Sequence, residues 1–203
     1  MTLGIGVLCN KGETIVMGSE QRASYNVGNP VPIDPNDEAG KVYHVFPYRL
    51  FVSVAGSLSV CQEVYAQFAH LIENLKQGTE ISSELAAYLL NEARFHQLRR
   101  IYDWQLRRKM GVTLTQWAQG KIHGGKMSRL VVKFGHEILE NTPFKCEMIV
   151  CGHIEPHGIF LRASQKEHVQ EETSPGVYAI GCGQVSAIRH LNKRGQRNCP
   201  RLS

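Results

Sequence analysis

The chain has 203 residues, of which 42% are hydrophobic and 20% charged, and its formal net charge is +5. This composition is typical of a globular protein with one domain over residues 1–203, and it excludes a disordered chain or a repeat array. The positive charge falls short of the dense basic stripe that most nucleic-acid-binding proteins carry. No segment has the length or composition of a membrane span or a signal peptide, so we expect a cytoplasmic protein without a membrane partner.

The six cysteines lack the density of a secreted disulfide scaffold, so we expect reduced thiols. Cys146 and Cys151 would face opposite sides of a strand, because strand side chains alternate. No Cys-x-x-Cys pair occurs, and the turn around Pro156 explains the neighbouring His153 and His157 without a metal. We therefore expect no metal site and no cofactor.

The first quarter of the sequence is rich in strand signals. Four short apolar runs predict strands: residues 2–8, 14–19, 41–46 and 50–54. Asn and Gly in residues 9–12 supply the turn of an opening hairpin. The Pro- and Gly-rich residues 25–37 predict a surface loop instead.

Helical spacing of apolar side chains begins at Val60 and ends at Gly78. Ser82 or Ser83 can cap a second helix that runs to Gly111. Its last part, residues 99–109, is strongly basic and contains Tyr102 and Trp104, which makes nucleic-acid binding one alternative. We interpret this run instead as a packing or assembly surface, and expect no nucleic-acid partner.

The second half returns to strands. Residues 120–125 predict a loop, and residues 129–140 fit either a helix or a strand. Strands are then predicted at residues 144–151, 158–163, 168–173 and 177–180, followed by a helix at 185–193. This segregation of strands and helices predicts an α+β protein with helices packed outside antiparallel sheets.

Several motifs occur in an order that resembles proteasome β subunits and their bacterial relatives. They are Thr2-Leu3-Gly4-Ile5-Gly6, Gly18-Ser19-Glu20-Gln21-Arg22-Ala23-Ser24, Gly40-Lys41-Val42-Tyr43, Val54-Ala55-Gly56 and Ala179-Ile180-Gly181-Cys182-Gly183. The resemblance implies a four-layer αββα sandwich of the N-terminal nucleophile hydrolase type. It also implies a peptide or protein substrate, assembly into rings or a related homo-oligomer, and an ATP-dependent unfoldase as a partner.

The resemblance also implies the catalytic roles. Thr2 would be the nucleophile once Met1 is removed, with its free α-amino group, of pKa about 8, as the base. Lys41 would stabilise the alkoxide electrostatically and Glu20 would hold Lys41, while the Gly56 N–H would stabilise the oxyanion. Three further positions match supporting or substrate-binding residues: Arg22 supports the site, and Ser24 and Val54 contact substrate.

Two features depart from the family pattern. Gly181-Cys182-Gly183 stands where the family has Gly-Ser-Gly, so a weak thiol donor replaces a hydroxyl. The family's further C-terminal Asp and Ser have no counterpart before Ser203, which indicates a fragment or a diverged member. Two alternatives therefore stay open: a non-catalytic ring subunit, and an N-terminal nucleophile amidohydrolase that acts on a small molecule.

Overall fold

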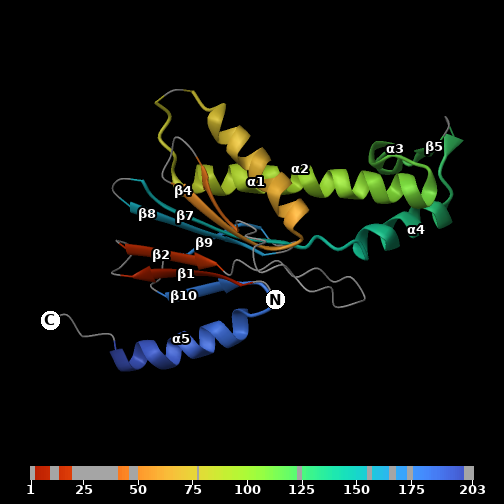
Figure 1. Ribbon diagram of the computed structural model, residues 1–203. Helices are drawn as coiled ribbons and strands as arrows, with labels where there is room; N and C mark the ends of the chain where they lie inside the picture. Colours follow the sequence, from red (N-terminus) through yellow and green to blue (C-terminus); the bar gives the residue numbers. More distant parts are fainter. Residues whose placement is uncertain are drawn as a thin grey trace, which may run out of the picture. The chain divides into compact units, whose positions relative to one another are not determined.

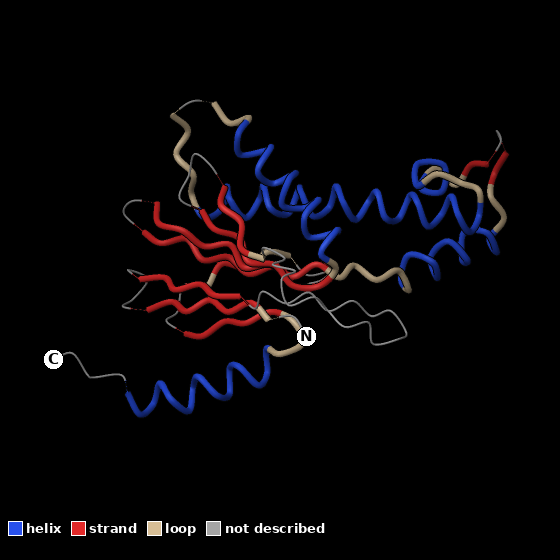
Figure 2. Tube along the Cα trace, in the orientation of Figure 1, coloured by secondary structure: helices blue, strands red, loops and turns tan. Residues whose placement is uncertain are grey.

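A computed structural model describes most of the chain. The described residues are 3–9, 14–19, 41–45, 50–76, 78–122, 125–154, 157–164, 168–172 and 176–198. They form a mixed α and β structure with several antiparallel sheets (Figures 1 and 2). The predicted loop at residues 25–37 lies outside them.

The chain divides into two compact units. The first unit contains residues 1–91 and 145–203, and the second contains residues 92–144. Helix α2 (Ser83–Met110) runs from the first unit into the second. The assignment of residues 1–203 to one domain stays a prediction.

The first unit contains two antiparallel sheets. The three-stranded sheet has the order β10-β1-β2, and the five-stranded sheet has the order β3-β4-β7-β8-β9. The strands are β1 (Gly4–Cys9), β2 (Thr14–Ser19), β3 (Val42–Val45), β4 (Leu50–Gly56), β7 (Cys146–Ile154), β8 (His157–Ala163), β9 (Gln170–Glu171) and β10 (Gly176–Ile180). The predicted opening hairpin is confirmed, because β1 and β2 pair with Cys9 opposite Thr14.

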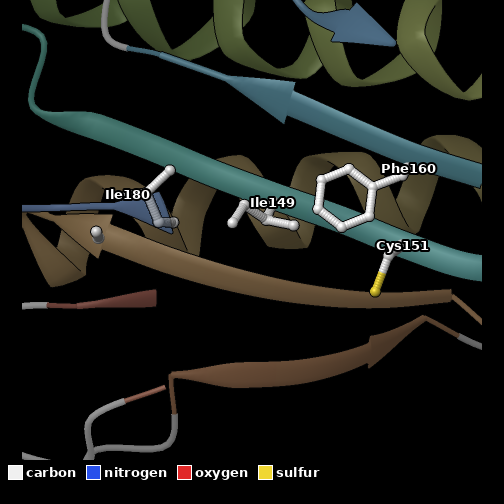
Figure 3. Packing of buried hydrophobic residues seen from close by; sticks show 5 residues of the cluster. Ile149, Cys151, Phe160 and Ile180 are labelled. Atoms are coloured by element: carbon white, nitrogen blue, oxygen red, sulfur yellow. The ribbon is translucent and has the colours of Figure 1, made fainter. Parts of the chain in front are cut away.

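The two sheets face each other across a buried apolar cluster. Its fully buried members come from the five-stranded sheet and from β10: Ala55, Ile149, Cys151, Phe160 and Ile180. Figure 3 shows Phe160, Ile149 and Ile180 between the strands. Glycine allows the close approach of β1, since a Cβ on Gly6 would lie 2.5 Å from the Phe160 ring. Each sheet thus covers the inner face of the other.

Helices cover the outer faces of both sheets. Helix α1 (Leu58–Glu73) packs on β4 and β7, and α5 (Gln184–Asn198) packs on β10 and β1 (Figure 1). The side of α1 that is buried carries Cys61, Val64, Phe68 and Ile72, at the spacing of one helical face. The layers of the first unit therefore follow the order helix, sheet, sheet, helix.

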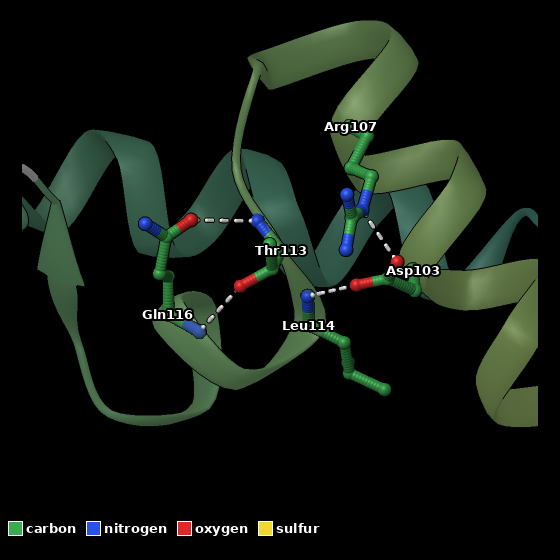
Figure 4. Close-up of polar contacts among 5 residues, drawn as sticks. All are labelled: Asp103, Arg107, Thr113, Leu114 and Gln116. Atoms are coloured by element: carbon green, nitrogen blue, oxygen red, sulfur yellow. Dashed lines mark hydrogen bonds and ion pairs between the residues drawn. The ribbon is translucent and has the colours of Figure 1, made fainter.

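The second unit is mainly helical. It contains the end of α2, then α3 (Leu114–Ala118), β5 (Lys121–Ile122), β6 (Gly125–Lys126) and α4 (Arg129–Glu140). Its core is built on Leu106, Val112 and Ile138. Asp103 connects α2 to the start of α3 (Figure 4). Its carboxylate accepts a hydrogen bond from the Leu114 N–H at 2.8 Å and another from Arg107.

Most of the predicted elements are confirmed, with two changes in the second unit. Residues 129–140 form a helix, because Ser128 caps it with a 3.3 Å bond from the Val131 N–H. The loop predicted at residues 120–125 is wrong in part, because β5 and β6 pair there. The short helix α3 was not expected; its capping box between Thr113 and Gln116 provides the local signal.

Four of the six cysteines have described side chains. Cys61, Cys146, Cys151 and Cys182 are free thiols. Cys151 lies in the cluster between the sheets. Cys146 lies close enough to Cys61 of α1 to raise the pKa of that thiol, so its side chain is on the helix side of the strand. The prediction that Cys146 and Cys151 face opposite sides of a strand is confirmed.

Candidate active site at the start of the first strand

The start of β1 packs tightly against β4. A Cβ on Gly4 would lie 2.6 Å from the Ser53 Oγ, so any side chain there would collide with β4. The next residue of β4, Val54, donates its backbone N–H to the Lys41 carbonyl at 3.0 Å. The beginning of β1 and the segment that carries Lys41 therefore meet on the same part of β4.

Lys41 is buried, with an exposed fraction of 4%. A buried ammonium must be paired or hydrogen-bonded. Without such partners, its loss of hydration would cost on the order of several kcal/mol. Lys41 does take part in a polar or electrostatic interaction in the structure. The structure therefore has a buried lysine whose backbone is bonded to β4, the strand on which Gly4 packs.

Gly56 ends β4 in a conformation that requires glycine. Its φ is +117°, and a Cβ would lie 2.4 Å from the Lys145 carbonyl oxygen. That oxygen also accepts the N–H of Ser57 at 2.8 Å, which fixes the path of the chain into α1. The glycine conformation and this hydrogen bond together define the backbone of the turn, and a preorganised N–H is the property that oxyanion binding needs.

A carboxylate connects the two sheets at the same end. Glu147 lies opposite Ala55 in the register of β7 and β4, and its Oε2 accepts the N–H of Gly181 at 2.6 Å. Gly181 has a φ of +90°, which turns the chain from β10 into α5. Cys182 follows, with its side chain exposed.

The glycine turn after β10 also contacts the first residue described. A Cβ on Gly183 would lie 3.4 Å from Leu3 Cδ1, an ordinary van der Waals contact. Leu3 precedes Gly4, which packs on Ser53. The site therefore combines the start of β1, the Lys41 segment, the end of β4 and the turn that carries Cys182.

The structure brings together three of the predicted site residues. Lys41, Gly56 and Cys182 all belong to segments that converge around the start of β1. Val54 is 2% exposed, and strand alternation places it on the face of β4 opposite Ala55. Its role in substrate binding stays a prediction. The other four predicted residues lie outside the described part of the chain: Thr2, Glu20, Arg22 and Ser24.

Two polar residues of the site were missed in the sequence. Ser53 is fully buried, and its hydroxyl has no hydrogen-bond partner among the described residues. Glu147 provides the carboxylate between the sheets. The available signal was a polar side chain at an inward position of an otherwise apolar strand, where burial requires a hydrogen bond or a function.

The buried thiols near the site are structural. Cys61 donates to the Ala55 carbonyl at 3.5 Å, and the neighbouring Cys146 and burial both raise the pKa of its thiol. Burial raises the pKa of Cys151 to about 12. Because the thiolate is the nucleophilic form, neither Cys61 nor Cys151 is suited to covalent catalysis at neutral pH.

No three His, Cys, Asp or Glu side chains in the described part of the chain lie close enough to hold a metal ion. No described helix is long and apolar enough to cross a membrane.

No protein-family model matches the chain, and no curated protein sequence matches it at a significant level.

Proposed function

We propose that this chain is an N-terminal nucleophile hydrolase related to proteasome β subunits, a threonine peptidase with Thr2 as its nucleophile. The observation that carries the proposal is the packing of Gly4, two residues after Thr2, on the strand that binds the Lys41 backbone. A mechanism based on the first residues of β1 needs a buried cation at this point. Lys41 is the buried lysine of the described chain.

The arrangement of the first unit supports the same proposal. Its helix, sheet, sheet, helix order is the order of layers that an N-terminal nucleophile hydrolase has. β1 lies in the middle of its sheet, between β10 and β2, so its start is held on both sides. A nucleophile on such a strand would be well oriented, which lowers the entropic part of the activation barrier.

The proposed reaction is hydrolysis of a peptide bond through an acyl-enzyme. The Thr2 hydroxyl attacks the peptide carbonyl, and its own α-amino group, free once Met1 is removed, takes the proton. Lys41 stabilises the alkoxide with Glu20 as its counter-ion, and the Gly56 N–H receives the oxyanion. The amino group protonates the departing amine, and water then releases the acid and restores Thr2.

The proposal includes the context that the resemblance implies. The protein acts on peptides or unfolded proteins in the cytoplasm, assembles with further copies of itself and works with an ATP-dependent unfoldase. Arg22 supports the site, and Ser24 and Val54 contact substrate. These roles require no metal or cofactor.

One observation favours a second candidate, a non-catalytic subunit. Cys182 stands in the glycine turn beside Leu3, where the family has a serine hydroxyl. A thiol is a weaker hydrogen-bond donor, so the hydroxyl's contribution to the site would be reduced. Such a subunit would keep the fold and the assembly surfaces but would not form an acyl-enzyme. An amidohydrolase of the same mechanism would differ only in its small-molecule substrate.

Intact mass spectrometry with a threonine-directed epoxyketone tests the proposal. We expect the Met-free chain to gain one probe mass, and Thr2→Ala and Lys41→Ala to gain none. Lys121→Ala, which removes an exposed lysine of β5, is the matched control and should react as the parent does. A Met-free, folded parent that does not react would contradict the catalytic proposal and leave the non-catalytic subunit. A reacting parent that hydrolyses no peptide would indicate the amidohydrolase.

A further inference from the structure

The positive charge of the chain is concentrated in its second unit. Residues 92–144 contain ten Lys and Arg against four Asp and Glu, a net charge of +6, while the whole chain has +5. The remaining residues therefore have a net charge of −1. The catalytic proposal assigns no role to this difference. A charge of this density attracts a polyanion over a distance of about one Debye length, roughly 8 Å at physiological salt.

Part of this charge lies on one side of α2. At 100° per residue, Arg100, Trp104, Arg107 and Arg108 fall within an arc of about 100°. We call these four side chains the basic face. All four are exposed, and Trp104 has an exposed fraction of 53%. Asp103, the acidic residue next to this face on α2, is already bonded to the Leu114 N–H and to Arg107.

The exposed indole is held in position by one of the arginines. The Arg108 guanidinium lies over the Trp104 ring, 5.1 Å from its centroid. A cation at this distance covers one face of the ring and restricts its rotation. The exposed part of the ring remains accessible for stacking, with guanidinium groups one turn before it and one turn after it.

The composition of the basic face distinguishes between classes of polyanion. The core of a protein–protein interface is poor in charge and needs a contiguous apolar area. The basic face has three guanidinium groups and one aromatic ring, without an aliphatic side chain. Arginine forks match phosphate oxygens, and a single exposed ring is sufficient to stack on a base. The exposed aliphatic side chain of the second unit, Leu130, belongs to another helix, α4.

We propose that the basic face binds single-stranded nucleic acid, with its arginines on consecutive phosphates and a base stacked on Trp104. This differs from the expectation drawn from the sequence, in which the same run is a packing surface. The structure supports the change because Trp104 and its arginines are exposed rather than packed into the core of the second unit. Recognition of this kind is independent of base sequence, because every base offers a ring face.

Fluorescence anisotropy of the full-length protein with a labelled thymidine 20-mer tests the proposal. We expect Trp104→Ala to weaken binding about tenfold, while Trp104→Phe, which keeps a ring, retains most of the affinity. Arg108→Ala should reduce the slope of log affinity against log salt by about 0.7, the value for one phosphate contact on a single strand. Lys133→Ala on α4 is the control, because it removes an exposed, positively charged side chain outside the basic face. It should change the affinity less than about twofold, since an isolated surface charge contributes little.

A second readout separates stacking from charge. The chain has two tryptophans, Trp104 and Trp117, so Trp117→Phe leaves Trp104 as the only indole emitter. We expect thymidine 20-mer to quench this emission, and heparin, which has charge but no bases, to leave it unchanged. Absence of binding at low salt would overturn the proposal. So would stronger binding of polyglutamate, which indicates an acidic protein partner, or equal binding of heparin that Trp104→Ala does not alter.

Discussion

The carboxylate of Glu147 accepts a hydrogen bond from the backbone N–H of Gly181 at 2.6 Å. Glu147 belongs to β7 of the five-stranded sheet, and Gly181 follows β10 of the three-stranded sheet. This bond therefore joins the two sheets at the end where β1 begins. It fixes the glycine turn that carries Cys182, and through Gly183 it supports the contact with Leu3.

Removal of this carboxylate should destabilise the first unit. A hydrogen bond to a charged acceptor contributes about 1.5–3 kcal/mol, so Glu147→Leu should lower the free energy of unfolding by about 2 kcal/mol. Glu147→Gln keeps an oxygen acceptor and should lose less than half of that. Urea unfolding followed by circular dichroism measures both. Equal losses in the two variants would show that the side-chain shape, and not the bond to Gly181, is what matters.

Gly56→Ala should be strongly destabilising. A residue with a side chain at a φ of +117° is strained, and the new Cβ would lie 2.4 Å from the Lys145 carbonyl oxygen. Because the backbone cannot shift here, we expect the variant to lose about 3 kcal/mol or more of its free energy of unfolding. Gly18→Ala on β2 is the control, since nothing lies within 4 Å of its new Cβ. We expect a small gain there, about 0.5 kcal/mol. Similar melting temperatures for the two variants would refute the assigned backbone geometry.

The thiols should divide into two reactivity classes. Cys182 is exposed, whereas Cys61, Cys146 and Cys151 are at most 3% exposed. Iodoacetamide at pH 8 should modify Cys182 in the native protein and the three buried thiols only after denaturation. For Cys151, with a pKa of about 12, roughly one thiol in ten thousand is ionised at pH 8. Peptide mapping measures each rate, and native labelling of Cys151 as fast as Cys182 would contradict the buried placement.

The parts of the fold that could be predicted are those with local signals. Asn10 and Gly12 predict the opening hairpin, and the Ser82 hydroxyl accepts the Leu85 N–H at 3.2 Å at the start of α2, as its cap position indicates. Residues 129–140 remained ambiguous because Val131 and Val132 favour strands, while the wider spacing favours a helix. The second unit could not be predicted as a separate body, because α2 continues through the boundary without a break.

Sequence motifs marked only part of the candidate site, whose role stays a prediction. Lys41 and Gly56 stand in short motifs, and both lie in the segments that converge on the start of β1. Glu147 has no motif, and its partner Gly181 is 34 residues away, so the bond depends on the packing of two sheets. The burial of Ser53 could not be predicted either. A serine in a strand is common, and it becomes informative only once the strand is known to be buried on both faces.

The stability of the second unit should depend on pH through Asp103. The hydrogen bond from the Leu114 N–H, followed by the Arg107 guanidinium, lowers the pKa of this carboxyl in the folded protein. Its contribution to the free energy of unfolding is therefore complete above its pKa in the unfolded chain, about 4. That contribution is lost as the pH falls through its lower pKa in the folded protein. Asp103→Asn should cost about 1 kcal/mol at pH 7, allowing for solvent screening, and less and less as pH falls toward 3.

Chemical denaturation from pH 7 to pH 3 measures this dependence. Glu137→Gln is the control, because Glu137 is exposed and its pair with Lys133 is long, at 4.0 Å. Surface pairs of this kind contribute little, so we expect a difference of less than about 0.5 kcal/mol across the range. A cost of Asp103→Asn that grows toward low pH would have the wrong sign and would exclude the assigned hydrogen bond.

Gly135 on α4 provides a test in which the usual effect of a substitution is reversed. In a helix interior Gly→Ala ordinarily stabilises by about 1 kcal/mol. At Gly135 the new Cβ would lie within 2.0 Å of the Trp117 Nε1, so we expect a loss of about 1–3 kcal/mol instead. The ring cannot move aside easily, because its other contacts include an edge-on packing with His136, 4.9 Å between centroids.

In a Trp117→Leu background the obstruction is absent, and Gly135→Ala should recover its stabilising sign. A double-mutant cycle measured by urea unfolding gives the coupling energy directly. Additive effects of the two substitutions would mean that Trp117 does not pack against the backbone of α4.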